Sequence, residues 1–521
     1  MGTTMRIAML QQRLSLQLRW ESLSSLLVVG GLGVALGYCT VAALSLPRAW
    51  TPLVIAAMLA PFIAMIAGTV RKLLLIVIML DLPLRLDIEL GHQPEFGAMG
   101  ILTGWSVSAT TLALIGLYSL WLTEAVTRQR YASQVHDHVS RPALAYLMCI
   151  GLSVIGASRP IFTAYELFLL LQMFFLFRYL VGTVHTRQEV FFIVTALLVG
   201  LTCESVIMIV TKIVGHGFSF AGISSNYPDL EAGQRTGGTL GHPNIAATYM
   251  VLIIPAALST LWTRAGVAVK GLAFLGAGLG TVALLFTLSR GGWLALLIAT
   301  FLLLRALWQR GWLPPPLLII LTGVALVVIA ASSSVILARF TADDHGSSYS
   351  RIPLIQVALR IILEHPVFGV GANNSPLLMS QYIPWYLTDM WVARIHNKYL
   401  LVGAETGLLG LGTFLWFLLA TIRRGWHTWK RNEDRFLALT ALGLSTALIG
   451  VMFQMLVEPF SSNTRPSIQM VWLIAGLLTA VSRIQDSHVA RKRHVPTMPG
   501  KATPPHVSVW SSPGPRTIPA Y

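Results

Sequence analysis

A polar loop meets an apolar helix at Arg394, His396 and Asn397, and residues of these types could take part in catalysis. Histidine has an ordinary pKa of about 6.5, so His396 could accept a proton from a hydroxyl group near neutral pH. Asn397 stands at the expected start of the helix, where its side chain would accept a backbone N–H as a cap. A lone histidine at such a boundary is also a common structural hydrogen-bonding residue. The pattern therefore predicts a general base at His396, with a structural role as the alternative.

A second candidate group consists of four arginines in or beside polar or glycine-rich stretches. They are Arg235, Arg290, Arg351 and Arg394. The guanidinium fork binds phosphate oxygens in pairs, so several converging arginines would form a diphosphate site. Arg290 is also expected at a helix N-terminus, where the backbone dipole favours an anion. The alternative is that these arginines contact lipid head groups or pair with acidic residues.

The glycine-rich motif RTGGTLGHPN at residues 235–244 adds His242 and Asn244 to the candidate binding residues. Its proline suits the first turn of a helix, and its glycines permit close backbone approach to a ligand, although they could equally shape a turn. Tyr399 would share the helical face of His396 and border the same pocket, although a tyrosine at a membrane interface is also ordinary.

Several other polar segments point to structural roles. The motif HPVFGVGANN at 365–374 is expected to form a turn that packs a large loop onto the helices, and residues 352–363 have the spacing of an amphipathic helix near the membrane face. Glu405 would stand about 13 Å along a helix from His396, so we expect it to satisfy a neighbouring helix or a loop donor instead. Asp343 and Asp344 fit a solvated loop tip better than a cation site.

The sequence contains no pattern typical of a metal or cofactor site. Cys39, Cys149 and Cys203 fall inside apolar runs without metal-ligand spacing. A phosphate-binding Walker loop, a Ser-His-Asp spacing and an HExxH motif are all missing from the sequence. We therefore expect neither a metal nor a cofactor.

Composition shows what environment must position these residues. Hydrophobic residues make up 55% of the 521 residues and charged residues only 11%, about half the charged fraction usual in soluble proteins. Apolar runs long enough to cross a bilayer as helices recur along the chain. The sequence therefore predicts an all-α polytopic membrane protein. Its net charge of +16 is interpreted as a topology signal on cytoplasmic loops, and nucleic-acid binding is discounted.

The apolar runs predict about 12–14 transmembrane helices. The expected spans are 23–46, 50–69, 72–84, 99–122, 142–157, 160–181, 189–213, 243–262, 269–288, 291–309, 315–336, 398–421, 435–457 and 467–482. When the loops are assigned alternately to two sides, most of the lysine and arginine residues fall on one side, which is therefore cytoplasmic. The four candidate arginines are exceptions that fall on the opposite, outward side.

This topology divides the chain into five parts. Residues 1–20 form a cytoplasmic N-terminus, and 21–336 form the first eleven helices, with a polar outward loop near 214–242. Residues 337–397 form a large outward loop, and 398–483 form the last three helices. Residues 484–521, basic and proline-rich, are expected to be a disordered cytoplasmic tail.

The order of five motifs resembles the O-antigen ligase and polysaccharide polymerase family over residues 235–410. The motifs are RTGGTLGHPN at 235–244, SRGGW at 289–293, Arg351, PVFGVG at 366–371, and HNKYL at 396–400 followed by AETGLLG at 404–410. The chain departs from the commoner pattern of the family by carrying additional N-terminal helices.

The resemblance implies a GT-C-like, metal-independent, inverting glycosyltransferase of the bacterial inner membrane with its active site facing the periplasm. The donor would be an undecaprenyl-diphosphate-linked glycan. By analogy, Arg235, Arg290, Arg351 and Arg394 would bind the donor diphosphate, and His396 would act as general base on the acceptor. Membrane lipids and other polysaccharide assembly proteins are further expected partners.

Two acceptors remain open within the family. A ligase transfers a finished glycan to lipid A core, whereas a polymerase transfers a growing chain to another lipid-linked repeat unit; we slightly favour a polymerase or exopolysaccharide role. A transporter of polysaccharide or lipid-linked sugar is the alternative function, but it would place charges near the membrane midplane on broken helices. A non-enzymatic scaffold would leave the arginine and histidine pattern unexplained.

Overall fold

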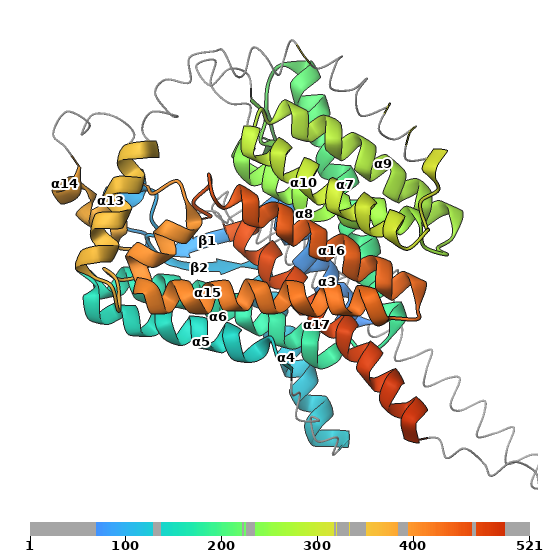
Figure 1. The fold of residues 1–521 in the computed structure, drawn as a ribbon. Coiled ribbons are helices and arrows are strands. Elements are labelled where there is room, and N and C mark those ends of the chain that lie inside the picture. The colour runs from blue at the N-terminus through green and yellow to red at the C-terminus, as the bar shows by residue number, and fades with distance from the viewer. Residues whose placement is uncertain are drawn as a thin grey trace, which may run out of the picture.

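The computed structural model describes residues 69–128, 137–220, 223–225, 235–316, 351–383, 394–460 and 465–494, together with positions 319, 323 and 333. These residues are almost entirely helical, which confirms the predicted all-α membrane fold (Figure 1). The expected spans at 23–46 and 50–69 and nearly all of 315–336 lie outside the described residues.

Thirteen α-helices are found in the described residues. They are α3 (Val70–Leu84), α4 (Ala109–Arg128), α5 (Ser140–Leu152), α6 (Pro160–Thr183), α7 (Arg187–Val214), α8 (Pro243–Leu261), α9 (Val267–Phe286), α10 (Arg290–Gln309), α13 (Arg351–Glu364), α14 (Ser375–Tyr382), α15 (Lys398–Arg431), α16 (Arg435–Gln454) and α17 (Arg465–His494). Eight of them, α6 to α10 and α15 to α17, are long and apolar enough to cross a membrane by length and composition.

Helix boundaries follow local capping chemistry. Thr186 and Glu189 form a reciprocal capping box at the start of α7, and Ser289 caps α10 by accepting a bond from Gly292 N. Asp434 caps α16 in the same way.

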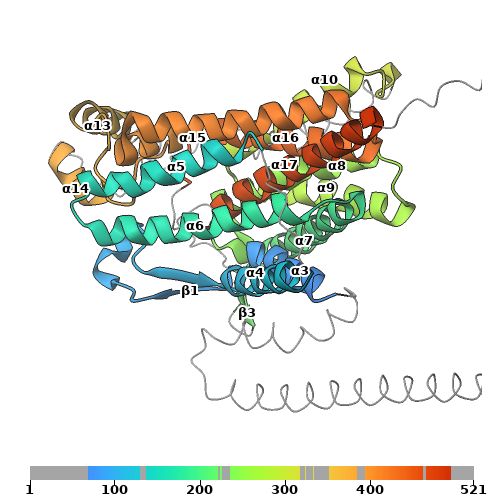
Figure 2. The same ribbon diagram turned by 90° about the horizontal axis from the view of Figure 1, so that it is seen from below.

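Among the spanning helices, α8, α16 and α17 are the most buried, and α16 packs against both α8 and α10. Figure 2 shows α5, α6 and α15 running side by side.

The segment expected to begin a span at residue 99 differs from the prediction. Strands β1 (Asp87–Leu90) and β2 (Trp105–Ser108) pair antiparallel, and a 3₁₀ helix at Pro94–Met99 lies between them. Helix α4 begins only at Ala109. Gly100 has a φ of +69°, which favours a turn, and Trp105–Ser108 alternates exposed or half-buried residues with buried ones as a strand does. The ribbon therefore replaces the first two turns of the expected helix.

Two further differences concern helix ends. Helix α5 stops at Leu152 and continues as a 3₁₀ turn at Ser153–Gly156. Helix α17 continues to His494, so the first part of the tail expected to be disordered from residue 484 is helical. Residues 495–521 lie outside the described residues.

The loop motif at 365–374 packs onto the helices, as its sequence indicates. Gly369 lies against the backbone of Glu405, Val370 N donates to Ala404 O at 3.0 Å, and Leu408 N donates to Pro366 O at 2.8 Å. Helix α15 is kinked at this contact, where Gly407 has a φ of +70°. The loop and the helix start that carries His396 are thus joined into one unit.

Helix α13 also forms as its amphipathic spacing predicts. Leu354 and Ile362 are buried against the loop and α15, whereas Ile352 and Leu363 are exposed. Figure 1 shows α13 and α14 together at one end of the molecule, beside the ribbon of β1 and β2.

Candidate functional site

The candidate site lies where several helices begin or end on the same side of the bundle. Helices α8, α10 and α15 begin there, and α16 ends there. The glycine-rich loop at 235–241 is held among them: Thr236 N donates to Phe286 O at 3.2 Å, at the end of α9. Thr239 donates through its backbone N to Glu204 of α7 at 2.9 Å and through its hydroxyl to Pro83 O at 2.9 Å. These bonds fix the loop between α3, α7 and α9.

His242 ends this loop and caps α8. Its Nδ1 accepts a hydrogen bond from Asn244 N at 3.2 Å, and Pro243 occupies the first turn as predicted. Burial and, to a smaller extent, the charges of Arg235 and Arg394 together lower the pKa of His242 to about 4. The imidazole is therefore neutral near pH 7, and its cap bond accounts for its orientation.

Arg235 is held by a short chain of polar contacts. Its Nε donates to Thr287 O at 2.9 Å, and its Nη2 donates to Asn244 Oδ1 at 2.6 Å. Asn244 Nδ2 in turn donates to Glu458 Oε1 at 2.6 Å. Thus the two candidate residues Arg235 and Asn244 are brought together, with Glu458 as a third member.

Glu458 is a site residue that sequence reasoning missed. It follows α16 and is only 9% exposed. Burial raises its pKa to about 7, against the opposing charges of Arg351 and Arg235. The signal was available, because an acidic residue in a short segment that is expected to face outward is unusual in an acid-poor membrane protein.

His396 is held against the C-terminal end of α16. Asn397 caps α15 as predicted, with its Oδ1 accepting from Leu400 N at 3.0 Å. Its Nδ2 donates to Leu456 O at 3.0 Å, and Lys398 N donates to Met455 O at 2.8 Å. These bonds attach the residues after His396 to the residues just before Glu458.

The electrostatic surroundings of His396 are strongly cationic. Burial lowers the pKa of His396 to about 4, and the nearby charges of Arg351 and Arg394 contribute to the same shift. Arg351 is the first residue of α13, and it acts on both His396 and Glu458. Arg351 and Arg394 therefore join the group that contains His242, His396 and Glu458.

Arg290 and Tyr399 lie beside α16 and the segment that follows it. Arg290 begins α10, and its neighbour Gly291 lies against Val457, which precedes Glu458. The hydroxyl of Tyr399 donates to Met452 O at 2.8 Å, so this side chain is engaged with α16. Glu405 has the structural partner expected of it, because its Oε1 accepts from Ser375 Oγ at 2.8 Å.

A cation site is not found in the part of the chain that the structure describes, where no three His, Cys, Asp or Glu side chains come together. Asp343 and Asp344 lie outside the described residues. What the described group does offer is a neutral imidazole, a buried carboxyl and several guanidinium groups at one end of the helix bundle. Such a group can bind an anion and accept a proton.

Sequence comparison identifies the family to which this arrangement corresponds. The family described as O-antigen ligase matches residues 273–415. The matched segment, 143 of the 521 residues, is thus similar to the O-antigen ligase family. The match supports a membrane glycosyltransferase of the ligase or polymerase type. No curated protein matches the chain.

The O-antigen ligase segment contains only part of the site. It includes α9, α10, α13 and the start of α15, and thus Arg290, Arg351, Arg394 and His396. Arg235, Asn244 and Glu458 fall outside the matched segment. The fold brings them to the same end of the bundle through the contacts described above.

Proposed function

We propose that this protein transfers a glycan from an undecaprenyl-diphosphate carrier to an acceptor hydroxyl on the periplasmic face of the bacterial inner membrane. The observation that supports it most directly is the convergence of His396 with Arg351 and Arg394, next to the chain of contacts from Arg235 to Glu458. A neutral base beside several guanidinium groups suits a reaction in which a hydroxyl loses a proton and a diphosphate leaves.

The proposed reaction is a single displacement. His396 accepts the proton of the acceptor hydroxyl while the oxygen forms a bond to the anomeric carbon of the donor. The bond from that carbon to the diphosphate oxygen breaks, and the electron pair leaves with the diphosphate. Arg235, Arg290, Arg351 and Arg394 stabilise the negative charge that develops there, so no metal ion is required. Attack from the side opposite the diphosphate inverts the anomeric configuration.

Donor binding would also activate the base. Without the donor, burial and the charges of Arg351 and Arg394 hold the pKa of His396 near its value of about 4, which makes a weak base. A bound diphosphate offsets the cationic charge and raises that pKa towards the ordinary value. His396 therefore becomes a stronger base only when the leaving group is in place.

Glu458 and Asn244 are proposed to hold Arg235 in position. The carboxyl of Glu458 accepts from Asn244, and Asn244 accepts from Arg235. His242 orients the same loop through its cap bond. These three residues would act through Arg235 on the diphosphate.

Transfer by the purified protein tests this function. The full chain in lipid nanodiscs is supplied with an undecaprenyl-diphosphate-linked oligosaccharide and, separately, with lipid A core or a second lipid-linked repeat unit. We expect product with one acceptor in the presence of a metal chelator, with undecaprenyl diphosphate released in equal amount. Lipid A core as the productive acceptor indicates a ligase, and the lipid-linked unit a polymerase. Movement of the donor across the membrane without bond transfer would instead support a transporter.

A further inference from the structure

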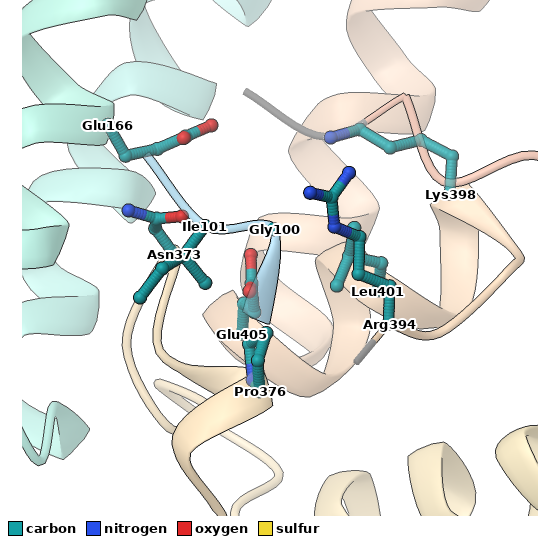
Figure 3. Close-up of a pocket in the computed structure, with 9 residues that line it drawn as sticks. All are labelled: Gly100, Ile101, Glu166, Asn373, Pro376, Arg394, Lys398, Leu401 and Glu405. Carbon is teal, nitrogen blue, oxygen red and sulfur yellow. The ribbon is translucent and has the colours of Figure 1, made fainter. Parts of the chain in front are cut away.

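A small polar chamber lies beside the start of α15, between this helix, α6 and the ribbon that precedes α4 (Figure 3). Its volume is about 20 Å³. Its lining includes Gly100, Glu166, Asn373, Arg394, Lys398 and Glu405. Figure 3 shows the carboxyl groups of Glu166 and Glu405 facing the same space as the charged ends of Arg394 and Lys398. None of the functions proposed above uses the two carboxyl groups or Lys398.

Glu166 carries an unsatisfied polar atom in this chamber. Its side chain comes from the outward part of α6 and the residue is only 5% exposed. Its Oε2 atom is buried and has no hydrogen-bond partner among the described residues. Glu405, by contrast, is held by Ser375. A buried carboxyl oxygen without a partner is costly, so a polar group from outside the protein is expected to contact it.

The size of the chamber limits that group to one of about the size of water. A site of about 20 Å³ can accommodate a single water molecule, which would need two to four polar partners. Carboxyl oxygens would accept a hydrogen bond from such a group, and the ammonium of Lys398, a residue only 8% exposed, would donate one to it. A hydroxyl group of a sugar meets the same requirements.

The chamber lies next to the segment that carries His396. Arg394 and Lys398, two residues before and two residues after His396, both line it. The contacts of Arg235 are instead made with the end of α9, the start of α8 and the segment after α16. In a single displacement the acceptor approaches from the side opposite the diphosphate. The chamber shares Arg394 with the proposed diphosphate site, but its α6 residue Glu166 and the turn at Gly100 make none of the contacts of Arg235, so we assign the chamber to the acceptor.

We propose that this chamber binds one hydroxyl group of the acceptor sugar, next to the hydroxyl that His396 activates. This inference rests on the proposed glycosyl transfer and names the acceptor as a sugar with a second hydroxyl group near the attacking one. Glu166 accepts the proton of that second hydroxyl in a hydrogen bond, and Lys398 donates to its oxygen. An acceptor that lacks the hydroxyl leaves both groups unpaired, and sites of this kind discriminate strongly against such analogues.

Gly100, in the turn between β1 and β2, lines the chamber next to Arg394. A Cβ atom at this position would overlap the guanidinium group of Arg394, and the positive φ of Gly100 also disfavours other residues. Leu102 N donates to Asn373 Oδ1 at 3.0 Å, which fixes the ribbon to the opposite wall. The ribbon thus forms one wall of the chamber and determines its size.

Sugar binding that does not depend on catalysis tests the chamber. Saturation-transfer NMR is recorded on the full chain in nanodiscs, without donor, using the methyl glycosides of glucose, galactose, mannose, rhamnose and N-acetylglucosamine. We expect at least one glycoside to give a signal that decreases at least tenfold in Glu166→Leu and in Lys398→Met. If every signal of the wild-type protein persists in Glu166→Leu, or if none is observed, the proposal is wrong.

A second buried acid provides the matched control. Glu204 of α7 is buried like Glu166, but it accepts hydrogen bonds from Thr239 and lies outside the chamber. Glu204→Gln should keep the glycoside signal that Glu166→Gln weakens, with both variants checked for folding by thermal unfolding. In transfer assays, Glu166→Gln should raise the acceptor KM at least tenfold and leave the donor KM unchanged. Absence of transfer by the wild-type protein would contradict the proposed function while the binding result still decides on the chamber.

Discussion

The contacts of Arg235 illustrate how single residues of the site depend on one another. Its guanidinium is held by Thr287 O and by Asn244, and Asn244 is held by Glu458. An arginine positioned on two sides before the donor arrives loses less conformational freedom on binding. The carboxyl group of Glu458 is tolerated in a proposed anion site because it accepts a hydrogen bond from the amide of Asn244. That bond orients Asn244, which in turn holds Arg235.

Arg235→Gln is predicted to reduce kcat/KM for the donor by about 100-fold, because the diphosphate loses a charged hydrogen-bond donor that strengthens as charge develops. Glu458→Gln should have a smaller effect, of about tenfold, since glutamine can still accept from Asn244. Steady-state transfer assays with the donor varied measure both. Equal activity of Arg235→Gln and wild type would contradict the role of Arg235.

The pH dependence of transfer should report two groups of the free enzyme. The pKa of His396 is lowered to about 4, so its base form predominates above that pH and protonation of His396 should cause no fall in kcat/KM for the donor as pH decreases through 6.5. Burial raises the pKa of Glu458 to about 7, so an inflection near that pH is assigned to this residue.

Two comparisons separate these groups. The inflection near neutral pH should disappear in Glu458→Gln while the acid limb remains. The acid limb of kcat, measured with saturating donor, should lie at higher pH than that of kcat/KM, because the bound diphosphate raises the pKa of His396. Identical acid limbs in the two profiles would contradict donor activation of the base.

Some individual residues could be predicted from the sequence and others could not. Asn397 caps α15, as its position before an apolar helix indicates. Glu405 is too far along the helix to orient His396, and it accepts a hydrogen bond from Ser375 instead. Glu166 escaped notice because a lone acid in an apolar segment has no spacing pattern, whereas Glu458 stands out only as an acid in a short segment between two apolar runs. Their importance depends on which residues the fold places opposite them.

At the scale of elements, the kink in α15 joins the large loop to the helix that follows His396. Gly407 has a φ of +70°, and a Cβ atom there would overlap Val367 O. Gly412, in the same helix, has nothing within 4 Å of a Cβ atom. The two glycines therefore form a matched pair for substitution by alanine.

Gly407→Ala is predicted to destabilise the protein by at least about 1–3 kcal/mol, because alanine is strained in this conformation and displaces the loop. Gly412→Ala should be neutral or stabilising by about 0.5–1 kcal/mol, since alanine favours a helix. Thermal unfolding in detergent compares the variants, and transfer activity should fall only in Gly407→Ala. Similar unfolding temperatures for both would show that the loop contact is unimportant.

Elements with strong periodicity were predictable, whereas those set by tertiary contacts were not. Helix α13 and the turn at 365–374 follow from apolar spacing and from glycines with positive φ. Residues 99–108, the second part of the ribbon, were mistaken for the start of a span because their apolar residues continue those of α4. Its strands are stabilised by pairing and by Asn373, which hydropathy cannot reveal.

At the scale of the whole molecule, a buried ion pair joins the two ends of the described chain. Arg465 of α17 contacts Asp81 of α3 through both terminal nitrogens, at 2.8 and 3.0 Å, and both residues are almost completely buried. Thr110 N also donates to Asp81 at 3.0 Å. This pair fixes α3 and the ribbon that follows it to the central helix α17.

Arg465→Met alone is predicted to destabilise the protein by about 3–5 kcal/mol, because it leaves the charge of Asp81 buried and uncompensated. The double variant Arg465→Met with Asp81→Asn should recover a substantial part of that loss. Thermal unfolding of the single and double variants in detergent measures the coupling. Additive losses in the double variant would contradict a direct role of the pair.

The central claim is that His396 removes the proton of the acceptor hydroxyl, and its most direct test is transfer by purified His396→Ala. The wild-type and variant proteins are compared in nanodiscs with lipid-diphosphate-linked glycan and the productive acceptor, and donor binding and unfolding temperature are measured in parallel. We predict that the transfer rate falls by about 10²–10⁴-fold, while donor binding and the unfolding temperature stay unchanged. Transfer by His396→Ala at the wild-type rate would contradict the proposed mechanism.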